Sequence, residues 1–315
     1  MTPAAADESS PSAGEPLLSI VVTIVEGGAA LERFLAALAA QQDPPPLEVL
    51  VPFDASVGPL TALRAAHPTV RFLDLGVVPT ARPPASAGGQ HELYDRRRAA
   101  ALAAATGDLV AILEDRGLPR ADWARQAVRL HRGEPAVIGG AIEPAPGRLI
   151  DWALHVCDYS RYSLPFVAGP VPWVSDVNVV YKRRALEATR ELWRDRFHEP
   201  AVHWELERQG EALILAPELV VVHHRRPAPF TRLLGERYHW GRLFGYIRAR
   251  EMPAGARLFR ALAAPLVPFV VLARHAAVWR RRGETARFVL ALPILLLFVA
   301  AWTLGETIGT LTGRP

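Results

Sequence analysis

Four acidic residues occupy positions from which their carboxylates could act together on a bound ligand. Glu26 and Asp54 follow the first two apolar runs of the chain, and Glu114 and Asp115 end a third run, residues 109–113. Short apolar runs bounded by glycine or proline predict buried strands. In an open α/β sheet, ligands bind outside the carboxyl ends of the parallel strands. The acids therefore predict a ligand cleft along one sheet edge, although each taken singly could be a solvated acidic turn.

The stretches between these acids predict the elements that position them. Strands are expected at 17–25, 47–53, 70–75, 109–113 and 136–142, and helices at 29–42, 60–66, 92–106 and 122–132. This alternation predicts an α/β fold with a Rossmann-type, mostly parallel sheet flanked by helices. Segment 77–90 is rich in proline, alanine and glycine, and is expected to be a mobile loop.

Composition bounds the class of protein. The chain has 315 residues, enough for one large domain or two small ones, and half of them are hydrophobic. Cys157 is the only cysteine, which excludes a disulfide within the chain and a zinc site built on cysteines. Residues 1–16 are small, polar and acidic and lack the parts of a signal peptide, so we expect them to be disordered.

Charge and apolar residues concentrate in the last third of the chain. Residues 223–315 carry 15 basic and 4 acidic side chains, whereas residues 1–222 carry 21 basic and 28 acidic ones. Basic residues interleaved with long apolar runs favour membrane lipids, at an anionic cytoplasmic surface, over nucleic acid as the partner.

The order of the motifs resembles the family 2 glycosyltransferases, which have the GT-A fold. Residues 18–23 resemble the opening strand, 48–56 the strand before the Asp-Asp-Gly-Ser turn, and 98–115 the helix and strand that end in Asp-x-Asp. Residues 174–183 resemble the acceptor-side segment, and 198–210 and 216–223 the closing motifs. The resemblance implies a glycosyltransferase domain at residues 17–228.

The resemblance also implies a reaction, in which a sugar moves from a nucleotide donor, most often of the UDP type, with inversion at the anomeric carbon. Glu199 occupies the position of the family's catalytic acid, the base that takes the proton of the acceptor hydroxyl. The simpler interpretation of Glu199 is an acid that favours a helix N-terminus. Asp176 and Asn178 would lie on the acceptor side, and the acceptor would be lipid-linked or an envelope glycan.

Other residues would bind the donor. Thr23, Glu26 and Asp54 would line the pocket for the nucleobase, with Arg98 close by. Asp54 and the two residues after it could also form a plain turn, because aspartate and serine favour turns. No Gly-x-Gly-x-x-Gly follows the first strand, so a dehydrogenase is not expected.

The central motif departs from the family pattern. Asp-x-Asp corresponds to Glu114-Asp115-Arg116, so an arginine, which cannot ligate a metal, replaces the second acid. Three alternatives remain open. Glu114 and Asp115, helped by His223, hold Mg²⁺ or Mn²⁺. Arg116 neutralises the diphosphate in place of the metal. Finally, the site is degenerate, and the chain is an inactive membrane-anchored nucleotide-sugar-binding or scaffold protein.

The C-terminal part is predicted to contact the membrane. Residues 229–257 are expected to form an amphipathic interfacial helix, in which arginines alternate with Leu233, Tyr238, Trp240 and Phe244. Of the family's processive Gln-x-x-Arg-Trp motif only Trp240 remains, so polymer synthesis is not expected.

The region 258–315 is expected to be membrane-associated. The run 261–273 is short for a span and contains two prolines, whereas 288–310 is long enough to cross. The arginines around the first run favour an interfacial or re-entrant position for it, with a hairpin of two spans as the alternative. The catalytic domain is then expected at the cytoplasmic face of a bacterial inner membrane.

Overall fold

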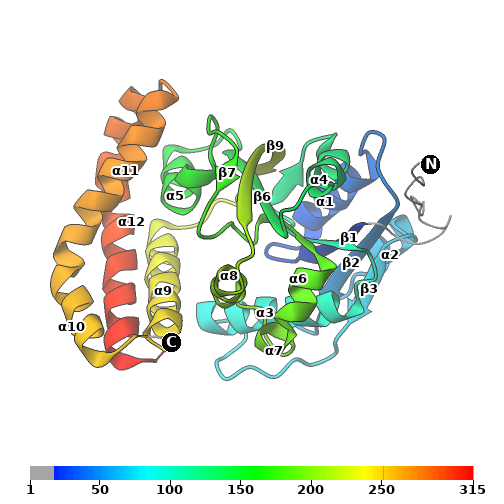
Figure 1. The fold of residues 1–315 in the computed structure, drawn as a ribbon, viewed down its shortest axis with the longest axis horizontal. Coiled ribbons are helices and arrows are strands. Elements are labelled where there is room, and N and C mark those ends of the chain that lie inside the picture. The colour runs from blue at the N-terminus through cyan, green and yellow to red at the C-terminus, as the bar shows by residue number, and fades with distance from the viewer. Residues whose placement is uncertain (1–17, 251, 315) are drawn as a thin grey trace, which may run out of the picture.

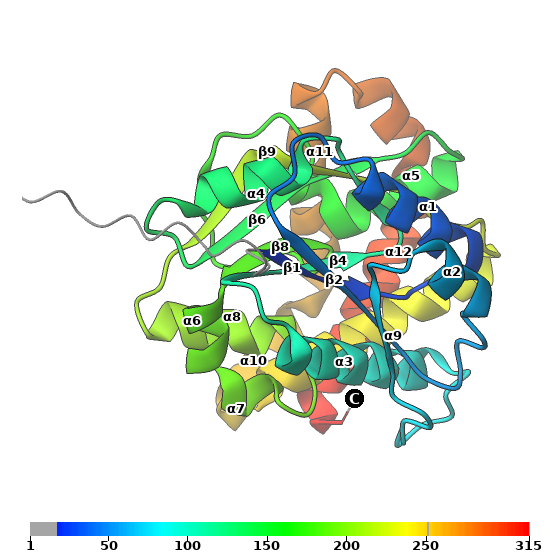
Figure 2. The same ribbon diagram turned by 90° about the vertical axis from the view of Figure 1, so that its right-hand side faces the viewer.

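The computed structural model describes residues 18–250 and 252–314, so the segment 1–16, predicted to be disordered, lies outside the described residues. A mixed sheet forms the centre of the molecule, with helices on both of its faces (Figures 1 and 2). The strands are β1 Leu18–Thr23, β2 Leu47–Phe53, β3 Arg71–Asp74, β4 Leu109–Glu114, β5 Gly117–Pro119, β6 Val137–Pro144, β7 Gly169–Pro170, β8 Asn178–Lys182 and β9 Leu213–His223.

The helices follow the strands in chain order. They are α1 Gly28–Ala39, α2 Thr61–Ala66, α3 Ala87–Ala104, α4 Trp123–His131, α5 Leu149–Tyr159, η1 Ser160–Tyr162, α6 Arg183–Ala188, α7 Arg190–Trp193, α8 Glu199–Arg208, α9 Phe230–Ala249, α10 Ala254–Ala263, η2 Ala264–Leu266, α11 Val267–Arg281 and α12 Thr285–Thr312.

The sheet has two unlike halves. Its order is β3-β2-β1-β4-β8-β6-β9-β5, with β7 paired to β9. The half formed by β3, β2, β1 and β4 is parallel, as the alternation of elements predicted, while β8 runs antiparallel to both of its neighbours. Strands β1 and β4 are apolar on both faces because helices cover both. Thr23 lies opposite Glu114 in the register, so the acidic strand ends share one edge, as expected.

Helix α3 begins earlier than the sequence suggested. The segment 77–90 was expected to be a loop, but the helix starts at Ala87. The Ser86 hydroxyl accepts a hydrogen bond from the amide of Gly89 over 3.1 Å, which caps the first turn. This cap allows two glycines to enter the helix.

Two C-terminal segments, Ala254–Arg281 and Thr285–Thr312, are long and apolar enough to cross a membrane. The first is longer than the predicted run 261–273, because its two prolines do not break it. Pro265 and Pro268 fall in the first turns of η2 and α11, where a missing amide leaves no hydrogen bond unmade. Helices α9, α10 to α11, and α12 lie side by side along one flank of the molecule (Figure 1).

Helix α9 packs against α12 through paired glycines. A Cβ on Gly241 would overlap the carbonyl of Trp302, and a Cβ on Gly305 would overlap the carbonyl of Tyr238. Small residues four apart allow two helix backbones to touch in this way. Helix α9 was predicted to lie at the lipid headgroups, but it lies between the α/β domain and α12.

Candidate active site

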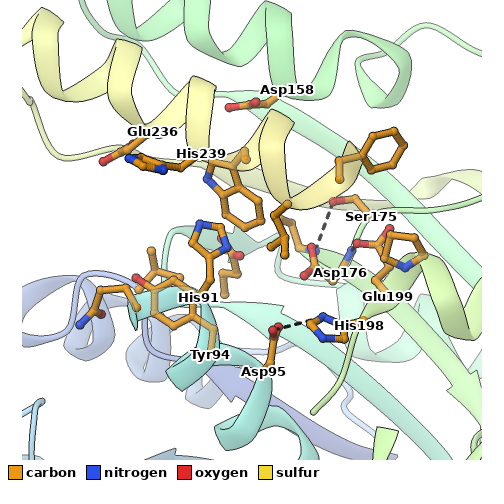
Figure 3. Close-up of a pocket in the computed structure, with 18 of the residues that line it drawn as sticks. His91, Tyr94, Asp95, Asp158, Ser175, Asp176, His198, Glu199, Glu236 and His239 are labelled. Carbon is orange, nitrogen blue, oxygen red and sulfur yellow. Dashed lines mark hydrogen bonds and ion pairs between the residues drawn. The ribbon is translucent and has the colours of Figure 1, made fainter. Parts of the chain in front are cut away.

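A cavity of about 750 Å³ lies at the acidic edge of the sheet. Its walls come from α3, the end of β4, the segment before β8, the start of α8, and α9, with Trp302 of α12 behind them. In Figure 3, side chains of α3 and α9 face each other across this space, with Asp176 and Glu199 beside them.

One face of α3 supplies a wall of polar side chains. His91, Tyr94, Asp95 and Arg98 recur at the spacing of one helix face, and all four line the cavity. Only Arg98 was predicted from the sequence, although this spacing was readable there. Nδ1 of His198, at the start of α8, lies 3.2 Å from the Asp95 carboxylate (Figure 3).

Arg98 joins the acidic edge of the sheet to the opposite wall of the cavity. Its Nε donates to the Thr23 hydroxyl over 2.8 Å, and Nη2 donates to Glu114 over 3.2 Å. Its Nη1 lies 2.5 Å from the carboxylate of Asp176. Thr23, predicted to bind the nucleobase, is fully buried and does not line the cavity; it orients Arg98 instead.

Three carboxyl groups share this cavity. The backbone amide of Asp176 donates to Glu199 over 3.2 Å, and Glu114 is linked to Asp176 through Arg98. Burial, and then the negative charge of Asp176, raise the pKa of Glu199 well above its usual value. The same two causes raise the pKa of Glu114 to about 7. Glu114 is therefore suited to exchange a proton near neutral pH, and Glu199 holds its proton more tightly than an exposed glutamate does.

Asp115 has a different role from the predicted metal ligand. Its carboxylate accepts hydrogen bonds from the amides of Val25, Glu26 and Gly27, at 3.1, 3.1 and 2.7 Å. The side chain is almost fully buried and does not line the cavity. Asp115 thus fixes the loop between β1 and α1, and its position does not suit a metal in the cavity.

Asp54 is also engaged within the protein. Its carboxylate lies 2.5 Å from Nε of Arg97, and it accepts the amide of Ser56 over 2.7 Å. Burial opposes ionisation, but these hydrogen bonds outweigh it and lower the pKa of Asp54. Asp54 was predicted to contact a nucleobase; it is buried outside the cavity lining, where it holds Arg97 and the turn after β2.

Asn178 belongs to the core rather than the acceptor side. It is fully buried, and its amide nitrogen donates to the carbonyls of Ala141 and Leu219 over 3.0 and 2.8 Å. Its oxygen accepts the indole N–H of Trp123 over 2.9 Å. Asn178 was predicted to lie on the acceptor side, but its side chain is engaged in the core, whereas Asp176 lines the cavity.

Two guanidinium groups lie at the wall formed by β4 and the segment after β9. Arg116 donates through Nε to Glu26 over 2.9 Å, and Arg225 pairs with Glu236. Burial, and then the charge of Arg116, lower the pKa of Arg225. Each guanidinium group carries five N–H donors, more than its single carboxylate partner, Glu26 or Glu236, can accept. This wall therefore suits a multiply charged anion such as a diphosphate.

His223 and Glu114 could hold a divalent cation. The buried Nε2 of His223 has no hydrogen-bond partner and lies 4.0 Å from the Glu114 carboxylate. Burial, then Arg116, lower the pKa of His223 well below its usual value, which keeps the ring neutral, as a ligand must be. Among residues 18–250 and 252–314, no group of three His, Cys, Asp or Glu side chains could hold an ion. Glu114 lines the cavity, whereas His223 is buried beside it, so these two side chains would hold an ion only together with further ligands from a bound molecule.

Comparison with known proteins identifies the fold. No family model matches the chain, and no curated protein matches its sequence. The mannosyltransferase PcManGT from Pyrobaculum calidifontis, solved with GDP-Man and Mn²⁺, matches with a TM-score of 0.54 and 18% identity over 91% of this chain and 86% of that one. TarS 1–349 from S. aureus, solved with UDP-GlcNAc, has a TM-score of 0.47 and 13% identity over 70% and 65%. The chain therefore has a glycosyltransferase-like α/β fold, as its motifs predicted.

Proposed function

We propose that the chain is an inverting glycosyltransferase that moves a sugar from a nucleotide-sugar donor to a lipid-linked or envelope-glycan acceptor. The reaction would take place at the cytoplasmic face of a bacterial inner membrane. One observation carries the proposal: within a glycosyltransferase-like fold, Arg98 connects Glu114 at the donor edge to Asp176, which itself contacts Glu199. Acid, base and anion-binding groups thus surround one cavity.

The wall of Arg116 and Arg225 is proposed to bind the donor diphosphate. As the bond between the anomeric carbon and the phosphate oxygen breaks, negative charge grows on that oxygen. The two guanidinium groups neutralise it, and they are fixed beforehand by Glu26 and Glu236. Glu114, with His223 beside it, would hold a divalent cation if one binds with the donor, and such an ion would supply further positive charge to the diphosphate.

Glu199 is proposed to act as the base. The acceptor hydroxyl oxygen forms a bond to the anomeric carbon while the phosphate leaves from the opposite face, and the hydroxyl proton passes to the Glu199 carboxylate. The raised pKa of Glu199 makes its ionised form a stronger base than an exposed glutamate. The amide of Asp176 orients the carboxylate for this transfer.

The end of the cavity at α9 suits an apolar part of the acceptor. Trp240, Leu243, Phe244 and Ile247 form one face of α9, and Trp302 of α12 lies behind them. Apolar and aromatic walls with a few polar groups favour ligands that carry an apolar segment. This end supports a lipid-linked acceptor over a soluble glycan.

The test is sugar transfer and donor hydrolysis by the purified chain, with UDP- and GDP-sugars, in Mn²⁺ or in EDTA. Glu199→Gln is expected to lower kcat by about a hundredfold or more while donor binding is retained. Glu205→Gln is the matched control, because Glu205 lies on the same helix and pairs with Arg208 outside the cavity.

Four outcomes separate the alternatives. Failure of the wild-type chain to bind any nucleotide sugar would overturn the proposal. Donor binding without turnover on any acceptor would instead support an inactive binding or scaffold protein. Turnover that survives EDTA assigns the neutralisation of the diphosphate to Arg116, whereas turnover lost in EDTA and restored by Mn²⁺ assigns it to a bound ion.

A further inference from the structure

One face of helix α12 is covered by the α/β domain and α9 from Phe288 to Thr310. Near its start, Phe288, Ala291, Leu295 and Phe298 pack in one cluster with Trp152 of α5. Further along, glycines on α12 touch the backbone of α9. From residue 288 to residue 310 the helix extends about 33 Å, comparable to the hydrocarbon thickness of a bilayer, about 30 Å. The covered face is therefore as long as a membrane span.

The turn between α11 and α12 is attached to the domain. The indole N–H of Trp279, a fully buried residue, donates to the Ser160 hydroxyl over 2.7 Å. Arg282 forms a two-point ion pair with Glu143, at the end of β6, with distances of 3.0 and 3.1 Å. These contacts hold the turn against strand β6 and helix η1.

The opposite end of the hairpin is attached as well. Glu306 of α12 pairs with Arg248 of α9 over 3.1 Å and with Arg260 of α10 over 3.3 Å. If the hairpin crossed a bilayer along its axis, its turn would lie on the far side, about 30 Å from the near surface. The contacts of Trp279 and Arg282 with the domain would then be impossible.

The outward face of the hairpin is apolar and exposed. Phe259, Leu262 and Phe269 are 73%, 73% and 68% exposed, and Leu290 on α12 is 68% exposed. Further exposed apolar side chains on the same three helices and η2 are Leu258, Leu266, Val270, Val289, Leu297, Leu304 and Leu311. Figure 1 shows α10 and α11 on the flank farthest from the sheet. An exposed apolar surface of this extent marks an interaction site.

Charge identifies the partner of this surface. Arg274, Arg280 and Arg281 are exposed near the turn, and Arg250 and Arg260 are exposed near the opposite end. Apolar side chains between basic groups match an anionic lipid leaflet, in which the apolar face enters the acyl boundary and arginines meet the phosphates.

We propose that α10, α11 and α12 form an in-plane membrane anchor: the hairpin lies along the surface of an anionic leaflet and does not cross it. This inference rests on the membrane attachment in the proposed function but is independent of sugar transfer. It also replaces the expectation of a span at 288–310. Since α9 and Trp302 line the cavity, an in-plane hairpin keeps the apolar end of the cavity beside the lipid surface.

The topology test uses the full chain in sealed bacterial membranes and a membrane-impermeant maleimide. Single cysteines are introduced at the turn with Arg281→Cys, at the end of α12 with Thr312→Cys, and in the domain with Val77→Cys. The wild-type chain, with its partly buried Cys157, gives the background. All three sites are expected to label in inside-out vesicles and to resist label in intact cells.

Labelling of the turn or of the end of α12 from the face opposite to Val77→Cys would overturn the proposal, because it requires a crossing. Sugar transfer is not measured, so this failure would leave the proposed reaction untouched. If the chain shows the expected labelling but transfers no sugar, the membrane-anchor proposal stands and only the proposed function is contradicted.

A second test examines the lipid contact. The triple variant Phe259→Glu, Phe269→Glu, Leu290→Glu is expected to bind vesicles containing phosphatidylglycerol at least about tenfold more weakly than the wild type. Val77→Glu and Val167→Glu place the same charge on apolar residues that are 85% and 92% exposed elsewhere, and should not change binding. Unchanged binding of the triple variant, or a lipid-free dimer that buries the hairpin, would overturn the proposal.

Discussion

The guanidinium group of Arg98 lies 2.5 Å from the carboxylate of Asp176, and this ion pair joins the two halves of the sheet across the cavity. Arg98 belongs to α3, which covers the parallel half, while Asp176 precedes β8 in the antiparallel half. Both residues are largely buried, so water screens their charges only weakly. Burial opposes the charge of Arg98, but Asp176 and Glu114 outweigh it and raise its pKa.

The first prediction concerns Arg98→Lys. A single ammonium cannot reach Thr23, Glu114 and Asp176 together, so one buried carboxylate loses its partner. We expect a loss of about 3 kcal/mol in the free energy of unfolding and a fall of about a hundredfold in kcat/KM. Denaturant unfolding and steady-state kinetics measure the two effects. Arg125→Lys, in an exposed pair with Asp43, is the control and should change stability by less than about 1 kcal/mol. Equal stability of the two variants would contradict a structural role for Arg98.

The second prediction concerns the pH dependence of transfer. The base must be ionised to accept a proton, and the pKa of Glu199 is raised while that of Glu114 is about 7. We therefore expect kcat/KM to rise with pH through neutrality, falling about tenfold per unit on the acid side. The residual activity of Glu199→Gln should lose the Glu199 part of this dependence. A profile that stays flat from pH 5 to pH 8 would exclude Glu199 as the base.

The third prediction concerns the effect of Asp95 on stability. Burial, the main cause, raises the pKa of Asp95 to about 8, so the folded chain holds a proton that the unfolded chain releases near pH 4. The contribution of protonated Asp95 to the free energy of unfolding is therefore fully present below about pH 4 and is lost as the pH rises toward 8. Asp95→Asn should flatten this slope, which is worth up to about 1.4 kcal/mol per pH unit. Thermal melts at pH 5 and pH 8 measure it, and the wild type should show the larger drop in Tm.

A contact with His198 supports the protonated form of Asp95. His198 lies 3.2 Å from Asp95, and burial lowers the pKa of His198 to about 4, so a neutral pair with one shared proton is expected at neutral pH. Asp108→Asn changes an exposed carboxylate and serves as the control. If Tm depends on pH equally in Asp95→Asn and in the wild type, Asp95 is ionised in the folded chain.

The acidic sheet edge could be predicted from the sequence because it depends on local patterns. An apolar run that ends in an acid places that acid at a strand end, and parallel strands bring such ends together. Thr23 and Glu114 are accordingly in register. The individual roles could not be predicted in this way. Asp115 and Asn178 have side chains that could bind a ligand, but these side chains form hydrogen bonds with backbone groups of distant segments instead.

The position of α9 could not be predicted for a related reason. Its amphipathic pattern identifies an apolar face but not the surface that covers it, and the sequence suggested lipid. The covering surface is α12, about 60 residues later in the chain, and the contact depends on glycines, which carry little hydrophobic signal. The same helix face that was assigned to the membrane, around Trp240 and Phe244, lines the cavity.

The final prediction tests this contact with Gly305→Leu. A leucine side chain would overlap the backbone of α9 at Tyr238, so α9 and α12 must separate, at a cost of about 1–3 kcal/mol. Because Trp302 lies one turn away and lines the cavity, the separation should also raise the KM for a lipid-linked acceptor more than the KM for the donor. Gly255→Ala in α10 is the control: its added Cβ meets open space, so the helix should gain up to about 1 kcal/mol. Kinetics with both substrates and thermal melts measure the result. Equal changes in the two KM values would mean that α12 supports the fold without shaping the acceptor end of the cavity.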